Sequence, residues 1–535
     1  MPLDDSLQHE CGVSGVARLE DRVSPHDVTR AGLQLSYNQR NRGPHATGAM
    51  TVRHRRAREP VKALLPPQEW VPASKQAAFC AEQEADMAIF HNRYATTGGN
   101  TLERAQPLSM HGRGVCFNGN ITNYNQLMAQ LGLEQRIGSD TELLLGMVDS
   151  YADEAVVFEP EAMLQQMDAL LDGCWNMGYL DSERLIVSRD HHGFRPMHTV
   201  EHDGMFLASS ESFALKRVIG QENHHKIREL QPGEYAMVQN QKVTYGNFAP
   251  ATPHGCFFEL IYFLYIASRL DGQHAYKIRY ETGRQMAREE LLRWTDSDNR
   301  STFPEFAVVF GVPRSGEPMA QGFANELTAL LGHLVPYITA LVRNDNSDRS
   351  FLHDQDPCDV LRSKFDVIEP ALNGEIAELH GMDPDRTHYF GVDDSLVRGN
   401  TTRYLMPLLG MFMRKPQRLH ARYGSPPVRY PCFKGIATPT VTELAATMFM
   451  DPQQRGHELV AGYEQMLSAY LGLSPFGSAR HISFQGLAEV LTAGGKSIDE
   501  FCTACLTGDY PTPGSMVRGL EAIETYRHLR GGMCN

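Results

Sequence analysis

The sequence has no hydrophobic run long enough to cross a membrane. Its longest apolar stretch, residues 257–267 (FFELIYFLYIA), is interrupted by Glu259 and is shorter than the roughly 18 residues that a membrane span needs. The first ten residues, MPLDDSLQHE, contain neither a basic nor an apolar segment, so they lack the features of a secretory signal. We therefore expect a cytoplasmic protein that does not enter membranes.

The chain is also poor in positive charge and in cysteine. Its formal net charge of −14 argues against a general nucleic-acid-binding protein, which needs a basic field, but is compatible with a local basic pocket for a phosphate. In a reducing cytoplasm, the 10 cysteines among 535 residues are expected to be free thiols or metal ligands. The 42% apolar and 21% charged residues are typical of a globular protein, and the length predicts two or three domains.

Two patterns of secondary structure divide the chain. Up to about residue 245, short β-like runs are bounded by Gly, Asn or Asp, as in antiparallel sheets. Residues 246–255 contain two prolines and two glycines and predict a linker. The apolar segment 306–312 is followed by a helical pattern, and 387–412 repeats that order, which predicts a parallel α/β sheet. The tail beyond residue 480 is expected to be mostly helical.

Cys11 precedes a run of small apolar residues that predicts a strand. A thiol with an ordinary pKa near 8.5 is mostly un-ionised at neutral pH, so a nucleophilic cysteine needs a nearby base. If residues 1–10 are removed, the α-amino group of Cys11, with a pKa of about 8, lies beside its own sulfur and supplies that base. A buried cysteine ahead of a strand is the other interpretation, and it is the commoner one for a lone cysteine.

Four further residues suit the chemistry of a free amino acid. Arg93 can grip a carboxylate with two hydrogen bonds. Asp140 can bind an amino group, and either it or Ser139 can cap the helix that follows. The Asn118 amide and the Gly119 N–H can stabilise the oxyanion of an acyl transfer.

Seven segments around these residues occur in the order found in the class II glutamine amidotransferase domain, an N-terminal-nucleophile hydrolase: CGVSGV, NRGPHATGA, HNRYATTG, FNGNITN, SDTELLL, RDHHGFRP and SSESFAL. The resemblance implies that residues 1–10 are a propeptide and that residues 11–245 form an αββα sandwich. It also implies that Cys11 attacks the glutamine amide and releases ammonia. Arg93 and Asp140 would bind the carboxylate and the amino group of glutamine, and Asn118 and Gly119 would stabilise the oxyanion.

A second motif, FGVDDSLVRGNTT at 390–402, places two acids at the end of an apolar strand, where α/β sheets bind ligands. In the following loop, small and hydroxyl residues let backbone N–H groups surround a phosphate at the start of a helix. Asp393 and Asp394 suit ribose hydroxyls and a divalent metal such as Mg²⁺. An Asp-Asp turn before a helix is common, so the doublet alone indicates little.

The whole thirteen-residue pattern resembles the phosphoribosyl pyrophosphate (PRPP) loop of type I phosphoribosyltransferases. Segments at 271–287, 312–326 and 424–440 extend a resemblance to the amidophosphoribosyltransferase family over nearly the entire chain. It implies a parallel α/β domain at 256–480, a tail at 481–535, and passage of ammonia to C1 of PRPP with displacement of pyrophosphate. This is the first step of purine synthesis. The implied Mg²⁺ and PRPP positions are Ser315, Asp393, Asp394, Ser395, Arg398, Gly399, Asn400, Thr401 and Thr402.

The chain departs from the family at two places. Arg314 stands where the family usually has an acid. The family's basic loop over the pyrophosphate corresponds to residues 341–352, where Arg343 and Arg349 keep a suitable register for PRPP but two aspartates are added. We therefore expect weaker closure over a polyanion.

Four cysteines form a candidate metal centre. Cys502 and Cys505 have a C-x-x-C spacing, which by itself fits a redox pair, zinc or no function. Cys256 and Cys432 match cysteines of the iron–sulfur branch of the family. The resemblance implies a structural [4Fe–4S] cluster held by the four thiolates, with Zn²⁺ as the second candidate.

The interpretation we favour is a glutamine-dependent amidophosphoribosyltransferase. A diverged paralog with a different phosphoribosyl acceptor and a lapsed iron–sulfur regulatory protein are the alternatives. The catalytic positions are all intact, which disfavours the second alternative. The resemblance further implies a homotetramer and feedback inhibition by purine nucleotides.

Overall fold

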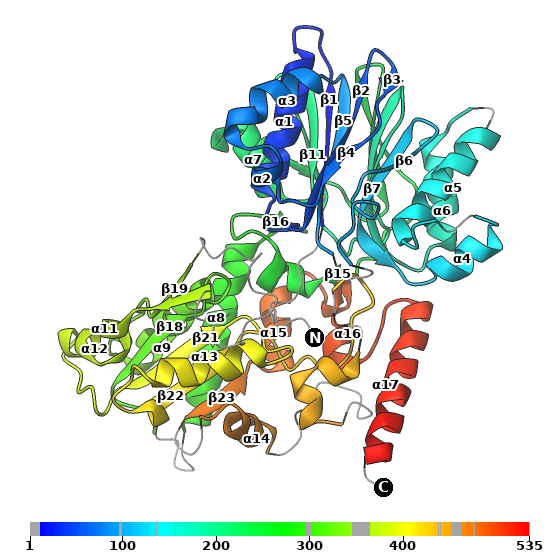
Figure 1. Ribbon diagram of the computed structural model, residues 1–535. Coiled ribbons are helices and arrows are strands. Elements are labelled where there is room, and N and C mark those ends of the chain that lie inside the picture. The colour runs from blue at the N-terminus through cyan, green and yellow to red at the C-terminus, as the bar shows by residue number, and fades with distance from the viewer. Residues whose placement is uncertain are drawn as a thin grey trace.

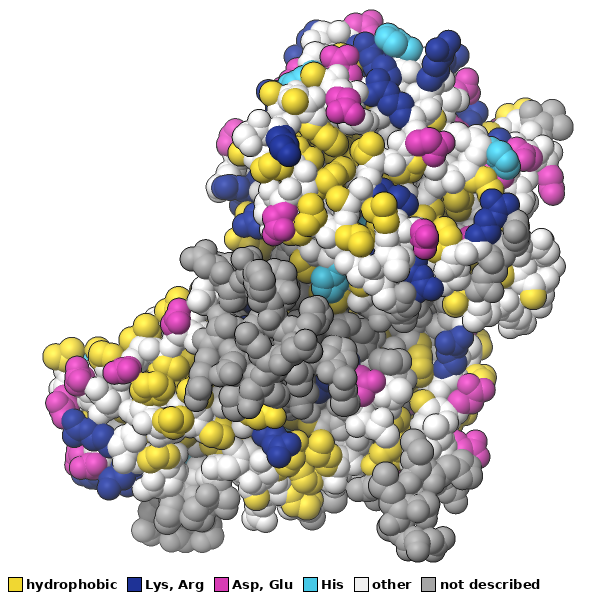
Figure 2. Space-filling view, viewed as in Figure 1, with side chains coloured by type: hydrophobic (Ala, Val, Ile, Leu, Met, Phe, Trp, Pro, Cys, Tyr) yellow, Lys and Arg dark blue, Asp and Glu magenta, His cyan; other side chains and the backbone are white. Residues whose placement is uncertain are grey.

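The computed structural model describes residues 11–95, 99–133, 136–155, 157–295, 301–344, 364–436, 438, 440–451, 459, 462–473 and 477–533, with only the backbone for Asn400, Thr401 and 527–533. In Figure 1, the N-terminal half forms the upper part of the molecule and a parallel sheet with its helices forms the lower left part. Figure 2 shows acidic and basic side chains interspersed over the visible face of the upper part.

Two antiparallel sheets stack in the N-terminal half. The first has the order β12-β10-β11-β1-β5-β2-β3, with β4 paired to β2; its strands are β1 (Gly12–Arg18), β2 (Ala46–Arg53), β3 (Arg56–Ala57), β4 (Val61–Ala63), β5 (Met87–Arg93), β10 (His198–His202), β11 (Met205–Ser209) and β12 (Arg228–Glu229). The second has the order β14-β13-β9-β8-β7-β6, with β6 (Leu108–Met110), β7 (Arg113–Ile121), β8 (Gly173–Leu180), β9 (Arg184–Arg189), β13 (Glu234–Gln239) and β14 (Lys242–Asn247).

Helices cover the outer face of each of these sheets. One core lies between the sheets and includes Val13, Met50 and Val187, while separate cores lie under the helices on either side. Those helices are α1 (Pro25–Asn38), α2 (Pro67–Trp70), α3 (Gln76–Glu82) and α7 (Ser212–Ile219) on the first sheet, and α4 (Tyr124–Gln130), α5 (Asp140–Glu154) and α6 (Pro160–Leu170) on the second. The αββα sandwich predicted from the sequence is thereby confirmed.

The second half is built on a parallel sheet of order β18-β21-β22-β23, with β18 (Ala307–Gly311), β21 (His388–Asp393), β22 (Leu419–Tyr423) and β23 (Ser478–His481). Alternate residues of β18 enter different cores, because Val309 packs on one face and Val308 on the other. A strand covered on both faces needs an uninterrupted apolar run, which explains AVVFG. The covering helices are α8 (Ala275–Arg293), α9 (Gly316–Leu331) and α15 (Phe484–Thr492) on one face, and α11 (Glu369–Leu372), α12 (Glu375–Leu379), α13 (Asn400–Gly410) and α14 (Tyr463–Tyr470) on the other.

Short elements lie between the halves, within the second half and in the tail: β15 (Gly255–Cys256), the π-helix η3 (Glu259–Phe263), β16 (Arg269–Leu270), β17 (Gln273–His274), β19 (Leu341–Arg343), β20 (Phe365–Val367), β24 (Phe501–Cys502) and α16 (Ala504–Thr507). The tail ends with the 21-residue helix α17 (Pro513–Met533). The tail beyond residue 480 is mostly helical, as predicted, in α15, α16 and α17. Its two-residue strand β24 pairs in parallel with β15, a contact between distant segments that has no local sequence signal. Within the described part of the chain, no helix combines the length and hydropathy needed to cross a bilayer.

A buried group of four charges joins the halves. Arg42 contacts Glu211 at 3.1 Å and Glu259 at 2.6 Å, and Arg195 lies 3.6 Å from Glu259. None of the four side chains is more than 1% exposed. The charge that interrupts the longest apolar run is therefore paired inside the protein.

Candidate active sites

Cys11 lies immediately before β1, a central strand of the first sheet between β11 and β5. The antiparallel register pairs Gly12 with Asn92, so Cys11 comes next to the end of β5. The Tyr94 N–H donates to the Cys11 sulfur at 3.4 Å. Burial raises the pKa of the Cys11 thiol, and the positive charges of Arg93 and Arg42 oppose that rise.

Arg93 and Asp140 reach the same place from other elements. Arg93 ends β5 and donates to Gly99 O and Asn100 Oδ1, each at 3.1 Å. Asp140 begins α5, and its carboxylate accepts from the N–H of Ile121 at 3.3 Å and from that of Thr141 at 3.0 Å. Burial raises the pKa of Asp140 to about 6, although Arg93 and the backbone donors lower it. Ser139 occupies the N-cap position of α5 but makes no side-chain capping bond, and Asp140 is the first residue of the helix.

The predicted oxyanion donors lie next to each other in β7. Asn118 is only 3% exposed, and its Nδ2 has no hydrogen-bond partner among the described residues. Leaving a buried amide N–H without a hydrogen-bond partner costs free energy. The Asn118 amide is therefore well suited to donate to the oxyanion of a bound substrate. A Cβ at Gly119 would lie 1.9 Å from the Cys174 carbonyl oxygen, which explains why the strand has glycine there.

Two buried glutamines support this site and were missed by the sequence analysis. Gln39 donates to Ser14 and accepts from Ser209 at 3.2 Å, beneath the start of β1. Gln106 accepts from the Phe117 N–H at 2.7 Å and donates to Thr141 at 2.9 Å, which joins the oxyanion strand to the helix of Asp140. Buried amides belong to no motif, so only the folded structure reveals them.

The second site lies at the carboxyl end of β21. Asp393 Oδ1 accepts from the Asp394 N–H at 2.9 Å, while Asp394 accepts from Ser315 and, at 2.6 Å, from Ser395. Burial raises the pKa of both carboxyls, and the neighbouring acid raises that of Asp393 further. The half-buried Asp393 and the buried Asp394, with hydroxyl neighbours, form the oxygen-rich donor set that Mg²⁺ prefers, so the residues fit that ion.

The loop after Asp394 leads to the start of α13. Gly399 has φ +82° at the N-cap of this helix, a conformation that favours glycine, and Thr402 is buried. Arg398 donates to Glu443 at 2.8 Å, so part of its guanidinium is already paired in this structure. Only the backbone of Asn400 and Thr401 is described, and it continues into the helix.

The residues predicted from the pyrophosphate loop are only partly described. Arg343 ends β19 and is half-buried, whereas Arg349 lies outside the described residues. Arg314 follows a cis peptide bond, and its charge opposes the rise that burial causes in the pKa of Glu317.

The four predicted metal-binding cysteines come together at the junction of the halves. Cys256 pairs with Cys502 in the β15–β24 register, and Cys505 follows in α16. The Lys434 N–H donates to the sulfur of Cys432 at 3.3 Å. Burial raises the pKa of Cys256 to about 12 and that of Cys502 to about 11, and the negative charge of neighbouring thiolates, Cys432 among them, raises both further.

The four cysteines could hold a metal centre through their sulfurs, as thiolates do in both zinc sites and iron–sulfur clusters. Among the described His, Cys, Asp and Glu side chains, the one group of three with all ligand atoms within 4.8 Å is a different one, His111, Asp149 and Asp153. Arg113 pairs with Asp149 at 2.6 Å and with Asp153 at 2.8 Å. Its positive charge therefore offsets the negative charge of the two aspartates in the His111–Asp149–Asp153 group.

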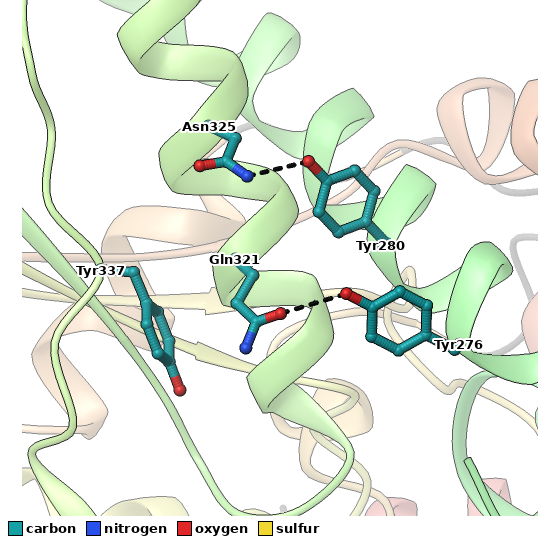
Figure 3. Close-up of a pocket in the computed structure, with 5 residues that line it drawn as sticks. All are labelled: Tyr276, Tyr280, Gln321, Asn325 and Tyr337. Carbon is teal, nitrogen blue, oxygen red and sulfur yellow. Dashed lines mark hydrogen bonds between the residues drawn. The ribbon is translucent and has the colours of Figure 1, made fainter. Parts of the chain in front are cut away.

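A separate hollow of about 470 Å³ lies on the outer side of α8 and α9. Figure 3 shows Tyr276 bonded to Gln321 and Tyr280 bonded to Asn325, with Tyr337 opposite. None of the predicted site residues lines it.

Fold and site together define an N-terminal-nucleophile amidotransferase domain joined to a domain of phosphoribosyltransferase type. Comparisons with known proteins agree. Residues 91–217 match the glutamine amidotransferase domain family. An amidophosphoribosyltransferase of Mycobacterium tuberculosis is 30% identical over 461 residues, which cover 83% of this chain and 77% of that protein. The chain belongs to the amidophosphoribosyltransferase family.

Two further comparisons cover both chains almost completely. An amidophosphoribosyltransferase of Archaeoglobus fulgidus is 28% identical over 94% of this chain and 98% of its own. A solved glutamine PRPP amidotransferase from B. subtilis, complexed with ADP and GMP, has a TM-score of 0.74 at 24% identity, over 94% of this chain and 97% of its own. The structural match supports the fold in both halves.

Proposed function

We propose that the chain is a glutamine-dependent amidophosphoribosyltransferase, which converts glutamine, PRPP and water to 5-phosphoribosylamine, glutamate and pyrophosphate. The observation that carries the proposal is the convergence of Cys11, Arg93 and Asp140, with the unpartnered Asn118 amide on β7, the strand that Asp140 contacts at Ile121. The same chain holds the paired acids at the end of β21.

In the amidotransferase half, removal of residues 1–10 gives Cys11 a free α-amino group, which takes the thiol proton. The sulfur attacks the glutamine side-chain carbonyl while Asn118 Nδ2 and the Gly119 N–H stabilise the oxyanion. Ammonia leaves, and water then hydrolyses the thioester to glutamate. Arg93 binds the substrate carboxylate, and Asp140, as a carboxylate, binds its amino group.

In the transferase half, ammonia attacks C1 of PRPP and pyrophosphate departs. Asp393 and Asp394 bind the ribose hydroxyls, and the backbone N–H groups from Ser395 to the start of α13 surround the 5′-phosphate. Asp393, Asp394 and Ser315 would hold Mg²⁺, which supplies positive charge against the developing pyrophosphate charge.

The resemblance supports further parts of this proposal. Cys256, Cys432, Cys502 and Cys505 would hold a structural [4Fe–4S] cluster. The protein would be a cytoplasmic homotetramer inhibited by purine nucleotides. The solved B. subtilis protein is described as complexed with ADP and GMP.

The decisive experiment uses the full chain, purified without oxygen and given glutamine, Mg²⁺ and PRPP. One pyrophosphate released per glutamate formed is the expected result. Glutamate without pyrophosphate would instead indicate a different phosphoribosyl acceptor, and the absence of both products would indicate a lapsed enzyme. A Cys11→Ala variant supplied with ammonium salts tests the transferase half alone.

A further inference from the structure

A loop from the second half packs directly against the oxyanion strand of the first. Asn120 Nδ2 donates to the Phe433 carbonyl at 2.8 Å. Cys174, which pairs with Asn120 across β7 and β8, donates through its sulfur to the Lys434 carbonyl at 3.1 Å. Arg195 donates to that same carbonyl. Two adjacent carbonyls of the loop are thus bound by three donors of the amidotransferase half.

The contact reaches the oxyanion hole itself. A Cβ at Gly435 would lie 3.4 Å from the Gly119 carbonyl and 3.0 Å from Arg195, so the loop backbone lies close to the peptide that follows the oxyanion N–H. Side chains alternate along a strand, which places Asn118 and Asn120 on the same face of β7. The residue that supplies an oxyanion donor and the residue that binds the loop are therefore next neighbours on one face.

The side chain and the N–H of Lys434 fix the loop further. Lys434 is 4% exposed; its Nζ donates to Thr512 at 2.7 Å and lies 3.7 Å from Asp172. Its N–H donates to the sulfur of Cys432 at 3.3 Å. A segment held through its backbone and through a buried side chain can position the strand on which it rests.

We propose that Asn120 is a positioning residue for glutamine hydrolysis: its bond to the Phe433 carbonyl fixes Gly119 and Asn118 where the oxyanion forms. The inference deepens the proposed function and rests on it. It explains why β7 has a polar side chain at position 120, directly after the two residues that donate to the oxyanion, Asn118 and Gly119. Because the oxyanion exists only in the transition state and the intermediate, misplacing its donors lowers kcat and leaves substrate binding by Arg93 and Asp140 intact.

The test is Asn120→Ala in the full chain, assayed for glutamate formation. We expect kcat to fall about 10- to 100-fold, since a shift of about 1 Å in a catalytic group has an effect of that size. The KM for glutamine should change less than kcat, because Arg93 lies on β5 and Asp140 on α5, and β7 gives Asp140 only the Ile121 N–H. Alkylation of Cys11 by iodoacetamide, followed by peptide mass spectrometry, should keep its rate, since that reaction forms no oxyanion.

Two further variants complete the design. Cys174→Ala withdraws the neighbouring donor to the same loop and should lower kcat in the same direction by a smaller factor. Asn223→Ala is the matched control, because Asn223 makes a 2.8 Å bond to the Ile219 carbonyl at the partly buried end of α7 and should leave kcat unchanged.

An unchanged kcat in a folded Asn120→Ala protein would overturn the inference. Equal losses in kcat and in the alkylation of Cys11 would also overturn it, since they indicate general disruption of the site. An unsubstituted protein that fails to hydrolyse glutamine would overturn the proposed function itself, and this inference with it.

Discussion

The buried charges between the halves give the sharpest stability prediction. Arg42 and Arg195 face Glu211 and Glu259, so the group is neutral and nearly inaccessible to water. Glu259→Gln leaves one uncompensated positive charge in the interior. Breaking a buried pair in this way costs about 3–5 kcal/mol, and we expect a loss of that size in the free energy of unfolding.

A double-mutant cycle separates this charge effect from a simple loss of packing. Arg42→Gln alone leaves an excess negative charge and should cost a similar amount. The double variant, Glu259→Gln with Arg42→Gln, is neutral again. It should therefore be no less stable than either single variant, which corresponds to a coupling energy of about 3 kcal/mol.

The measurement is urea unfolding followed by tryptophan fluorescence. Glu305→Gln is the control, because the Arg386–Glu305 pair has a distance of 2.6 Å but side chains that are 58% and 63% exposed. An exposed pair of this kind contributes less than about 1 kcal/mol. If Glu259→Gln costs no more than the control, or if the two single losses simply add, the reasoning is wrong.

Three further predictions concern the two active sites. Cys11→Ala should abolish glutamate formation while ammonium-dependent pyrophosphate release remains, and retention of residues 1–10 in its intact mass would show that their removal is autocatalytic; glutamate formation at the normal rate would contradict the nucleophile. The pKa of Asp140 is raised to about 6, so its carboxylate is lost as the pH falls through 6. The dissociation constant of glutamine for Cys11→Ala, measured by calorimetry, should rise about tenfold from pH 7 to pH 5, and a flat profile would refute this role. Asp393→Asn should reduce pyrophosphate release by at least about 100-fold. Because burial and Asp394 raise the pKa of Asp393, its charged form destabilises the metal-free fold as pH rises. The variant should therefore be more stable than the unsubstituted protein at pH 8, with a smaller gain at pH 5, and a loss at pH 8 would count against this explanation.

The sequence predicts those site residues that lie in short, locally ordered segments. Cys11 precedes a strand, Asp140 begins a helix, and Asp393 ends a strand before a phosphate-type loop, so each is recognisable from a few neighbours. The αββα sandwich and the parallel sheet follow from periodicity and from the family's motifs. These features depend on local chain geometry, which a sequence displays directly.

Other features depend on contacts between distant segments. The pairing of Glu259 with Arg42 spans 217 residues, and from the sequence Glu259 appears only as an interruption of an apolar run. Gln106 lies between β7 and α5 without a motif of its own. Arg398 donates to Glu443, and no sequence pattern predicts Glu443 as its partner. Such pairs form only when the tertiary fold brings the segments together.

The parallel pairing of β15 with β24 has a consequence for the order in which the protein is completed. Every strand of the two antiparallel sheets lies between Gly12 and Asn247, so that half has all its strands while later segments are still being translated. The fourth parallel strand begins at Ser478, and Cys502 and Cys505 follow it. The set of four thiols is thus completed only after the fourth parallel strand, and a chain truncated before residue 502 has every strand of the amidotransferase sandwich but only two of the four thiols.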